Sequence, residues 1–369
     1  MKTVKILFVS CELKFSGGEQ VLLNLVAQLQ THHQVMVLLR PQSELAKRLV
    51  VNPVRCLISP NLRRLSEGGW AFLQSVVRGN WELWQLVHRE KIDVVIYNGV
   101  GPSIYGSGLN FLSRPQTVII HHNIQLGKLY ALYLKYVPFK SKIVCVSQAV
   151  RASIETESNH KRVRIIYNGL AVQPMDYSAK LTNVQVVRIA MAGHITHWKG
   201  FHIFLAALQQ LQVTQEIQVE ILGEAWTRAD LLYLEQLKTY VQDHELSDWV
   251  QFRGFVPLTE VLPSTHILVH ASVEPEPLGL VILEGMQYQC VVIASALGGV
   301  PEIIRNGENG FLYAAGNSQQ LARILTEILQ QLGTPRMRDL IKAGALTVRQ
   351  QFNLEKQAQT YQELFEDNP

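Results

Sequence analysis

Short apolar runs alternate with longer helical stretches along most of this 369-residue chain, and this alternation limits the fold more than any other feature. The runs are rich in Val and Ile, as in VKILFVS at 4–10 and CVVIAS at 290–295. Strands separated by helices are typical of parallel sheets, because a parallel strand needs a long crossover connection that helices provide. The sequence therefore predicts an α/β protein.

The alternation forms two series. The first has predicted strands at 4–10, 33–39, 93–98, 117–122, 141–147 and 163–168, with helical stretches at 19–30 and 79–90. The second has predicted strands at 186–193, 218–224, 249–255, 265–272 and 290–295, with helical stretches at 202–211 and 279–288. Residues 170–183 between them lack a regular period and contain Pro, Asp, Ser and Asn, which indicates a linker.

This arrangement predicts two Rossmann-like, doubly wound domains in tandem, over residues 1–175 and 184–350. A further helix is predicted in 351–369 and is expected to pack back toward the N-terminal domain. The length agrees with two domains. Ligands of such sheets bind outside the carboxyl ends of the strands. The expected site is therefore a cleft between two facing domains.

Composition indicates a soluble protein, with 47% hydrophobic and 17% charged residues. No stretch of about 18 apolar residues is available to span a membrane. The apolar run in MKTVKILFVSC is too short for a signal peptide and is interpreted as a strand. Four widely spaced cysteines fit a reduced, cytoplasmic compartment, with no disulfide and no metal site expected.

Charge is unevenly distributed. Residues 1–184 contain 22 Lys+Arg and 10 Asp+Glu, a net of +12, and subtraction from the totals of 34 and 30 leaves −8 for residues 185–369. No acid occurs between Asp93 and Glu155, whereas the cations there are Arg114, Lys128, Lys135, Lys140, Lys142 and Arg151. The N-terminal half therefore suits an anionic partner.

Glycines follow several predicted strands. Gly17 and Gly18 lie between the first strand and the first helix, where backbone N–H groups can meet a phosphate. Gly193 ends a strand shortly before Lys199, whose charge can pair with a diphosphate. A tight turn for the glycine pair, and an exposed surface position for the lysine, are the alternative interpretations.

The segment VEPEPLGLVILEGM at 273–286 places Glu274, Glu276 and Glu284 in an apolar setting, where carboxylates are rare unless they are paired. Here the chain resembles the retaining glycosyltransferases of the GT-B fold, family 4, over nearly its whole length. Glu276 and Glu284 have the E-x7-E spacing of that family. The other matching stretches are SGGEQ (16–20), CVSQAVRASI (145–154), IIYNGL (165–170), GHITHWKGFHIFLAAL (193–208), VQFRGFV (250–256) and GGVPEII (298–304).

The resemblance implies transfer of a sugar from a nucleoside diphosphate donor, such as a UDP- or GDP-sugar, to a glycan, lipid-linked or small-molecule acceptor, with retention at the anomeric carbon. It implies that the donor lies on the C-terminal domain and the acceptor on the N-terminal domain. By the resemblance, Glu276 would bind the hydroxyls of the transferred sugar and Glu284 would bind the ribose. His122 would lie near the anomeric centre, with His121 as the alternative candidate for that position. The groups suited to the diphosphate are Lys199, the amides of Gly279, Leu280 and Val281, and those of Gly17 and Gly18.

One position departs from the family. His194 stands where an arginine is usual after the glycine, so a bidentate contact to the diphosphate is lost or requires a protonated imidazole. The chain has no Asp-x-Asp, the pair that holds a metal ion in sugar transferases of the other main fold. No metal and no cofactor are therefore expected.

Two other functions remain open: a sugar-nucleotide epimerase or hydrolase on the same fold, and a nucleotide-sugar-binding protein without transferase activity. An NAD dehydrogenase is disfavoured because no G-x-G-x-x-G follows the first strand. Residues 62–91 interleave arginines with Trp70, Trp81 and Trp84, which suits an anionic membrane surface at the inner face, although packed surface helices are the alternative. Nucleic acid is disfavoured by the acidic C-terminal half.

Overall fold

The computed structural model describes residues 3–49, 54–64, 68–111, 115–125, 132–134, 140–155, 160–172, 178–182, 184–212 and 215–366. The contacts divide the chain into unit 1, Met1–Ala171 with Leu354–Pro369, and unit 2, Val172–Asn353. Part of the predicted linker and three of the predicted cations, Arg114, Lys128 and Lys135, lie outside the described residues. The roles predicted for the two domains stay predictions.

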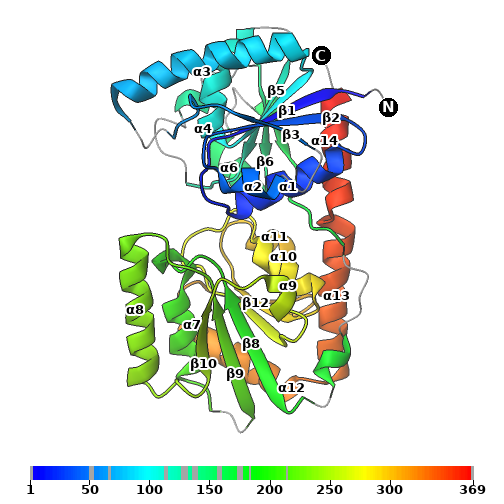
Figure 1. Ribbon diagram of the computed structural model, residues 1–369. Coiled ribbons are helices and arrows are strands. Elements are labelled where there is room, and N and C mark those ends of the chain that lie inside the picture. Colours follow the sequence, from blue (N-terminus) through cyan, green and yellow to red (C-terminus); the bar gives the residue numbers. More distant parts are fainter. Residues whose placement is uncertain are drawn as a thin grey trace. The chain divides into compact units, whose positions relative to one another are not determined.

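Unit 1 contains a seven-stranded parallel sheet in the order β3-β2-β1-β4-β5-β6-β7. Its strands are β1 (Lys5–Ser10), β2 (Gln34–Leu39), β3 (Arg55–Ile58), β4 (Val94–Asn98), β5 (Gln116–His121), β6 (Lys142–Cys145) and β7 (Val163–Ile165). Its helices are α1 (Gly17–Leu29), α2 (Glu44–Leu49), α3 (Gly69–Glu90), α4 (Val100–Ser103), α6 (Gln148–Ile154) and α14 (Leu354–Glu366). Figure 1 shows α1 and α3 on opposite sides of the strands. The central strands are therefore covered on both faces, which is why their sequences are almost continuously apolar.

All six predicted strands of the first series are present, but the structure adds β3 and lengthens one helix. β3 is an edge strand with half-exposed side chains, so its short segment RCLI lacks the apolar signal of a buried strand. α3 begins at Gly69, ten residues before the predicted start at 79. It accounts for most of the segment that interleaves arginine and tryptophan.

The last helix, α14, packs on α1 and is bonded to the end of the first series. The amide of Leu354 donates to the carbonyl of Leu170 over 2.9 Å, and the amide of Gly169 donates to Gln357 Oε1 over 3.0 Å. Lys142 Nζ donates to the carbonyl of Leu364 over 2.8 Å. The C-terminal helix is thus part of unit 1.

Unit 2 contains a six-stranded parallel sheet in the order β10-β9-β8-β11-β12-β13. Its strands are β8 (Val186–Ala192), β9 (Glu216–Leu222), β10 (Val250–Gly254), β11 (Ile267–His270), β12 (Val291–Ser295) and β13 (Phe311–Tyr313). Its helices are α7 (Phe201–Leu208), α8 (Arg228–Asp243), α9 (Leu258–Val261), α10 (Leu280–Gln287), α11 (Val300–Ile303), α12 (Ser318–Gln331) and α13 (Pro335–Gln351). The five predicted strands of the second series are present, and the three-residue β13 is new.

The strand order reverses direction once in each sheet, between β1 and β4 in unit 1 and between β8 and β11 in unit 2. In doubly wound sheets the loops that follow these two neighbouring strands separate and leave a crevice for a ligand. A ligand site is therefore expected at the carboxyl ends of these strands. No helix among the described residues is long and apolar enough to cross a membrane.

Candidate active site

The reversal point of unit 2 brings Lys199 and Glu276 together. Lys199 follows β8 and Glu276 follows β11, and Lys199 Nζ lies 2.7 Å from Glu276 Oε2. The two side chains are only 16% and 13% exposed. Two residues that the sequence predicted separately, 77 positions apart, thus form one partly buried ion pair.

Backbone contacts join the loop after β8 to the loop after β11. The amide of Val273 donates to the carbonyl of Trp198 over 2.8 Å. Gly200 has a φ of +73°, and a Cβ at this position would lie 1.9 Å from the carbonyl oxygen of Ala271. Only glycine fits this approach, so the backbone fixes the direction from which Lys199 reaches the carboxylate.

Glu276 has two further partners, which the sequence analysis missed. Its Oε2 lies 3.3 Å from His270 Nε2 and accepts a hydrogen bond from Ser272 Oγ over 3.2 Å. Burial acts to raise the pKa of Glu276, but the charge of Lys199 and the bond to His270 outweigh it and hold the pKa well below its ordinary range. Glu276 is therefore ionised at neutral pH.

The glycine pair at 298–299 packs against the loop that carries Glu276. The amide of Gly299 donates to the carbonyl of Glu276 over 2.8 Å. Gly298 has a φ of +61°, and a Cβ there would lie 2.1 Å from the same carbonyl oxygen. The pair therefore supports the backbone of Glu276.

Helix α10 begins beside this loop. Gly279 is its N-cap, with a φ of +97°. The N–H groups of Leu280 and Val281 belong to the first helical turn, where amides have no intrahelical acceptor. The predicted position of these three residues at a helix N-terminus agrees with the structure, and such a terminus favours an anion.

Glu284 lies one turn further along α10. It is half-buried, and its side-chain carboxylate has no hydrogen-bond or ion-pair partner among the described residues. Burial raises its pKa to about 7. The two glutamates of the E-x7-E spacing thus have opposite environments.

His194 and Gly193 follow β8. His194 Nε2 lies 3.2 Å from Asp230 Oδ2, and the imidazole stacks on Trp226 with 4.1 Å between ring centroids. Burial acts to raise the pKa of Asp230, but hydrogen bonds from Thr227 and Thr196 and the proximity of His194 together lower it. The imidazole thus lies beside an acid and an indole ring, and the sequence analysis predicted neither contact.

The reversal point of unit 1 holds a chain of hydrogen bonds that ends at His122. Asn98, the last residue of β4, donates from Nδ2 to Glu19 Oε1 over 3.1 Å, and Ser16 Oγ donates to Glu19 Oε2 over 2.6 Å. His122 Nε2 lies 2.9 Å from Asn98 Oδ1. Burial raises the pKa of Glu19, whereas the bond from Ser16 lowers it in part.

This chain defines the tautomer of His122. Because the amide nitrogen of Asn98 donates to Glu19, its oxygen faces His122 and must accept, so His122 carries its proton on Nε2. Burial lowers the pKa of His122 to about 4, so the ring is neutral at pH 7. His122 Nδ1 then retains a lone pair. His121, the rival candidate, is 1% exposed within β5.

Gly17 and Gly18 open α1, directly before Glu19. A Cβ at Gly18 would meet no atom within 4 Å, so packing does not require glycine there. The open space above the first turn leaves room for a ligand atom.

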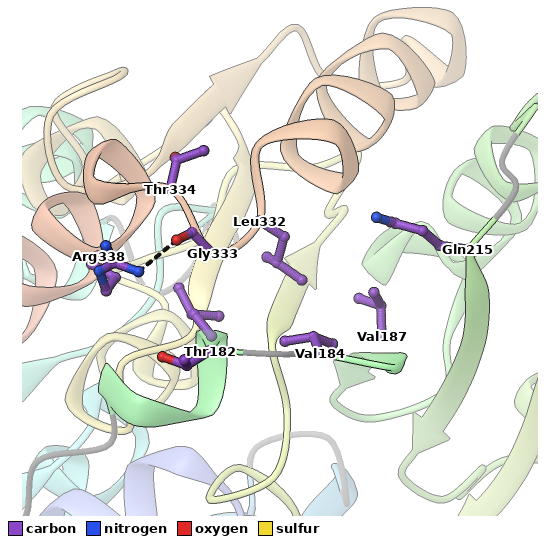
Figure 2. Close-up of a pocket in the computed structure, with 9 residues that line it drawn as sticks. Thr182, Val184, Val187, Gln215, Leu332, Gly333, Thr334 and Arg338 are labelled. Carbon is purple, nitrogen blue, oxygen red and sulfur yellow. Dashed lines mark hydrogen bonds between the residues drawn. The ribbon is translucent and has the colours of Figure 1, made fainter.

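A cavity of about 400 Å³ lies elsewhere in unit 2, near the amino ends of β8 and β9 (Figure 2). It is lined by Leu181, Thr182, Val184, Val187, Gln215, Leu332, Gly333, Thr334 and Arg338. In Figure 2 the Arg338 guanidinium donates to the carbonyl of Gly333. Since ligands of doubly wound sheets bind at the carboxyl ends, this cavity is separate from the candidate site.

The fold is that of the GT-B glycosyltransferases. The chain superposes on a glycosyltransferase from Rickettsia africae with a TM-score of 0.86, 19% identity, and coverage of 100% and 99% of the two chains. It superposes on HepE from Anabaena, solved with UDP and glucose, with a TM-score of 0.82, 22% identity, and coverage of 99% and 100%.

Family models match both halves of the sequence: "Glycosyltransferase Family 4" matches residues 15–173 and "Glycosyl transferases group 1" matches residues 178–346. The chain belongs to this group 1, family 4 glycosyltransferase family. A curated relative, the amylovoran biosynthesis glycosyltransferase AmsK of Erwinia amylovora, is 28% identical over 198 residues, which cover 50% of this chain and 46% of AmsK. The chain thus spans about half the length of that relative, and 68% and 58% of two others.

Proposed function

We propose that the protein transfers a sugar from a nucleoside diphosphate sugar to an acceptor hydroxyl, with retention of the anomeric configuration and without a metal ion. The observation that carries the proposal is the Lys199–Glu276 pair at the reversal point of unit 2, next to the N-terminus of α10. The same helix carries Glu284, whose carboxylate has no partner among the described residues. A cation, open amides and two carboxylates in different environments fit the parts of a nucleotide sugar.

In this proposal the diphosphate lies between Lys199 and the first amides of α10. The leaving nucleoside diphosphate gains negative charge as the glycosidic bond breaks, and fixed positive groups stabilise that charge without rearrangement. Lys199 can take this part because the joined loops already orient its side chain. The same groups supply the positive charge that a metal ion supplies elsewhere.

Glu276 binds hydroxyls of the transferred sugar. Its carboxylate is ionised and accepts hydrogen bonds. Its three partners among the described residues all contact Oε2, which leaves Oε1 for a ligand. Glu284 accepts from the paired ribose hydroxyls, since a carboxylate can accept two hydrogen bonds side by side.

His122 contacts the reacting sugar from unit 1 in this proposal. Its neutral ring, with the proton held on Nε2, can accept a hydrogen bond at Nδ1 but does not act as a strong acid at pH 7. No residue is assigned as a nucleophile. Substitution at the same face of the sugar, assisted by the donor's own phosphate, is the mechanism we propose.

UDP-glucose is the first donor to test, because the structural neighbour HepE was solved with UDP and glucose. A glycan or lipid-linked acceptor is proposed, because the relative AmsK is described as an amylovoran biosynthesis glycosyltransferase. Thermal-shift screening with UDP, GDP, ADP and dTDP, and then with their sugars, identifies the base. A ligand at 100 times its Kd stabilises the folded state by about 2.7 kcal/mol.

A transfer assay then tests the reaction. Radiolabelled donor is incubated with the purified protein and a membrane extract, with and without EDTA, and the anomeric configuration of the product is read by NMR. Glu276→Ala should abolish transfer, whereas Glu274→Ala, at an exposed position two residues earlier, should not. Free sugar or an epimerised nucleotide sugar without acceptor product would support the epimerase or hydrolase alternative, and binding without turnover would support the binding protein.

A further inference from the structure

Helix α3 carries two apolar faces, and the described part of the chain covers only one of them. The residues that face the core of unit 1 are Phe72, Ser75, Gly79, Leu83, Leu86 and Val87. On another face Trp70 is 73%, Leu73 55%, Val77 72% and Trp81 59% exposed. Single exposed apolar residues are ordinary, but a contiguous exposed row on one helix marks an interaction site.

The exposed apolar residues lie along one side of the helix. At about 100° per residue, positions 70, 73, 77, 81, 84 and 88 fall within an arc about 80° wide and extend for about 27 Å. The rings of Trp81 and Trp84 stack with centroids 5.1 Å apart, and those of Trp84 and His88 lie 4.2 Å apart. We call these six residues the aromatic stripe of α3.

The charged residues of α3 that lie nearest the stripe are arginines. Arg78 and Arg89 are exposed and lie about 60° and 80° outside the arc, whereas Glu82 and Glu90 lie about 100° from it. The two acids of α3 are engaged elsewhere: Glu82 accepts hydrogen bonds from Ser59 and Asn61, and Glu90 pairs with Arg55 at 3.0 Å and with Arg89 at 3.2 Å. The arginines of α3 therefore lie nearer the stripe than its acids do, and Arg78 has no ion pair among the described residues.

We propose that the aromatic stripe of α3 docks on a lipid bilayer that contains anionic lipids, with the helix axis parallel to the membrane plane. Indole rings favour the boundary between headgroups and acyl chains, because they are apolar with one polar N–H group. Arginines beside such a face bind the anionic headgroups.

A second copy of the chain fits the stripe less well. An isologous dimer through α3 would bring the same stripe of both copies together, with Arg78 and Arg89 of each copy at the rim. Like charges across an interface are unfavourable. The inference does not depend on which reaction the protein catalyses.

The test is vesicle flotation of the full-length protein. Vesicles of phosphatidylcholine alone are compared with vesicles in which 30% of the lipid is phosphatidylglycerol. Wild type should float with the anionic vesicles, and 0.5 M NaCl should weaken this binding. Val77→Gln/Trp81→Gln should bind at least about tenfold more weakly. Arg78→Gln should bind about fivefold more weakly, and Arg78→Gln/Arg89→Gln still more so.

The matched control is Leu231→Gln/Leu232→Gln, which removes two exposed leucines of α8 and should leave vesicle binding unchanged. Equal Tm values for all variants show that the fold is intact. The proposal is overturned if wild type fails to float with anionic vesicles, or if Val77→Gln/Trp81→Gln floats as wild type does. It is also overturned if light scattering shows a wild-type dimer that this variant dissociates, since the stripe is then an interface between copies.

Discussion

Glu284→Gln should make the unliganded protein more stable at pH 8 and at the same time weaken nucleotide binding. The substitution keeps the size and shape of the side chain and removes only its charge. Glu284 is half-buried and its carboxylate has no partner among the described residues, so its ionised form is disfavoured in the folded state. In the proposed function, the ribose of the nucleotide supplies the missing partners of this carboxylate.

The magnitude follows from the pKa shift. The folded-state pKa is about 7 against an ordinary value of 4.5, and 2.5 pKa units correspond to about 3.4 kcal/mol. Partial exposure reduces this limit, so we expect about 1–2 kcal/mol. For a unit of this size that is a rise in Tm of about 3–6 °C.

The sign of the pH dependence is determined by the raised pKa. Between pH 4.5 and 7 the folded state binds more protons than the unfolded state, so wild type loses stability as the pH rises through this window. Glu284→Gln should lack this loss. The two proteins should therefore have similar Tm values at pH 4.5 and differ most at pH 8.

Differential scanning calorimetry at both pH values gives the stability, and isothermal titration with UDP gives the affinity. Losing a charged acceptor for the ribose hydroxyls should weaken UDP binding about 10- to 100-fold. Glu274→Gln is the matched control and should change neither quantity. A lower Tm for Glu284→Gln at pH 8, or unchanged UDP affinity, would refute the reasoning.

Four further predictions follow from the described contacts. Lys199→Ala should destabilise the protein by about 3 kcal/mol, because it leaves Glu276 buried without its cation. The double variant Lys199→Ala/Glu276→Gln should recover most of the lost Tm, but it should not recover UDP binding. UDP-glucose affinity should fall as the pH drops from 8 to 6 in wild type, because ribose binding favours ionised Glu284, and titrations of Glu284→Gln should show a weaker dependence. Unit 1 should become less stable as the pH falls from about 6.5 to 4. The folded-state pKa values of His121 and His122 are about 4, so the unfolded state binds more protons over this range. In calorimetric scans His121→Asn should reduce this loss of stability. His122→Ala should lower the rate of sugar transfer while titrations show unchanged UDP affinity, and a loss of UDP affinity would argue against its assignment to the sugar.

The sequence was sufficient to predict the two parallel sheets, because strands buried on both faces leave continuous apolar runs such as VVIYN in β4. The strands it missed lack that run. β3 is a half-exposed edge strand, and β13 has only three residues. Helix α3 was predicted ten residues too short. A surface helix usually has one apolar face, which gives a hydrophobic period of 3.6 residues, but α3 has a buried and an exposed apolar face, and together they obscure this period.

The site could be predicted where single residues carry a recognisable pattern, and not where partners come from distant strands. Lys199 and Glu276 were each named from their own motifs, but their 2.7 Å contact depends on the parallel pairing of β8 with β11. His270 and Ser272 were taken as part of an apolar strand. Their signal was available, because polar residues at the carboxyl end of a strand beside the reversal point are placed to meet a ligand or its partners. Asn98 gave the same signal in unit 1.

The contrast between Glu276 and Glu284 explains why one spacing motif can serve two purposes. Glu276 has a cation and two further hydrogen-bonding groups on one oxygen, so its charge is stabilised before any ligand arrives. Glu284, eight residues later on α10, has none of these and has a pKa near 7. A pair of like groups whose environments separate their pKa values indicates different roles. Preorganised charge suits Glu276, which is proposed to act on the reacting sugar, because no reorganisation is then needed during bond cleavage. Uncompensated charge suits the ribose-binding role proposed for Glu284. Hydrogen bonds from the ribose hydroxyls would stabilise the carboxylate, and this free energy would add to the affinity for the nucleotide without changing the chemical step.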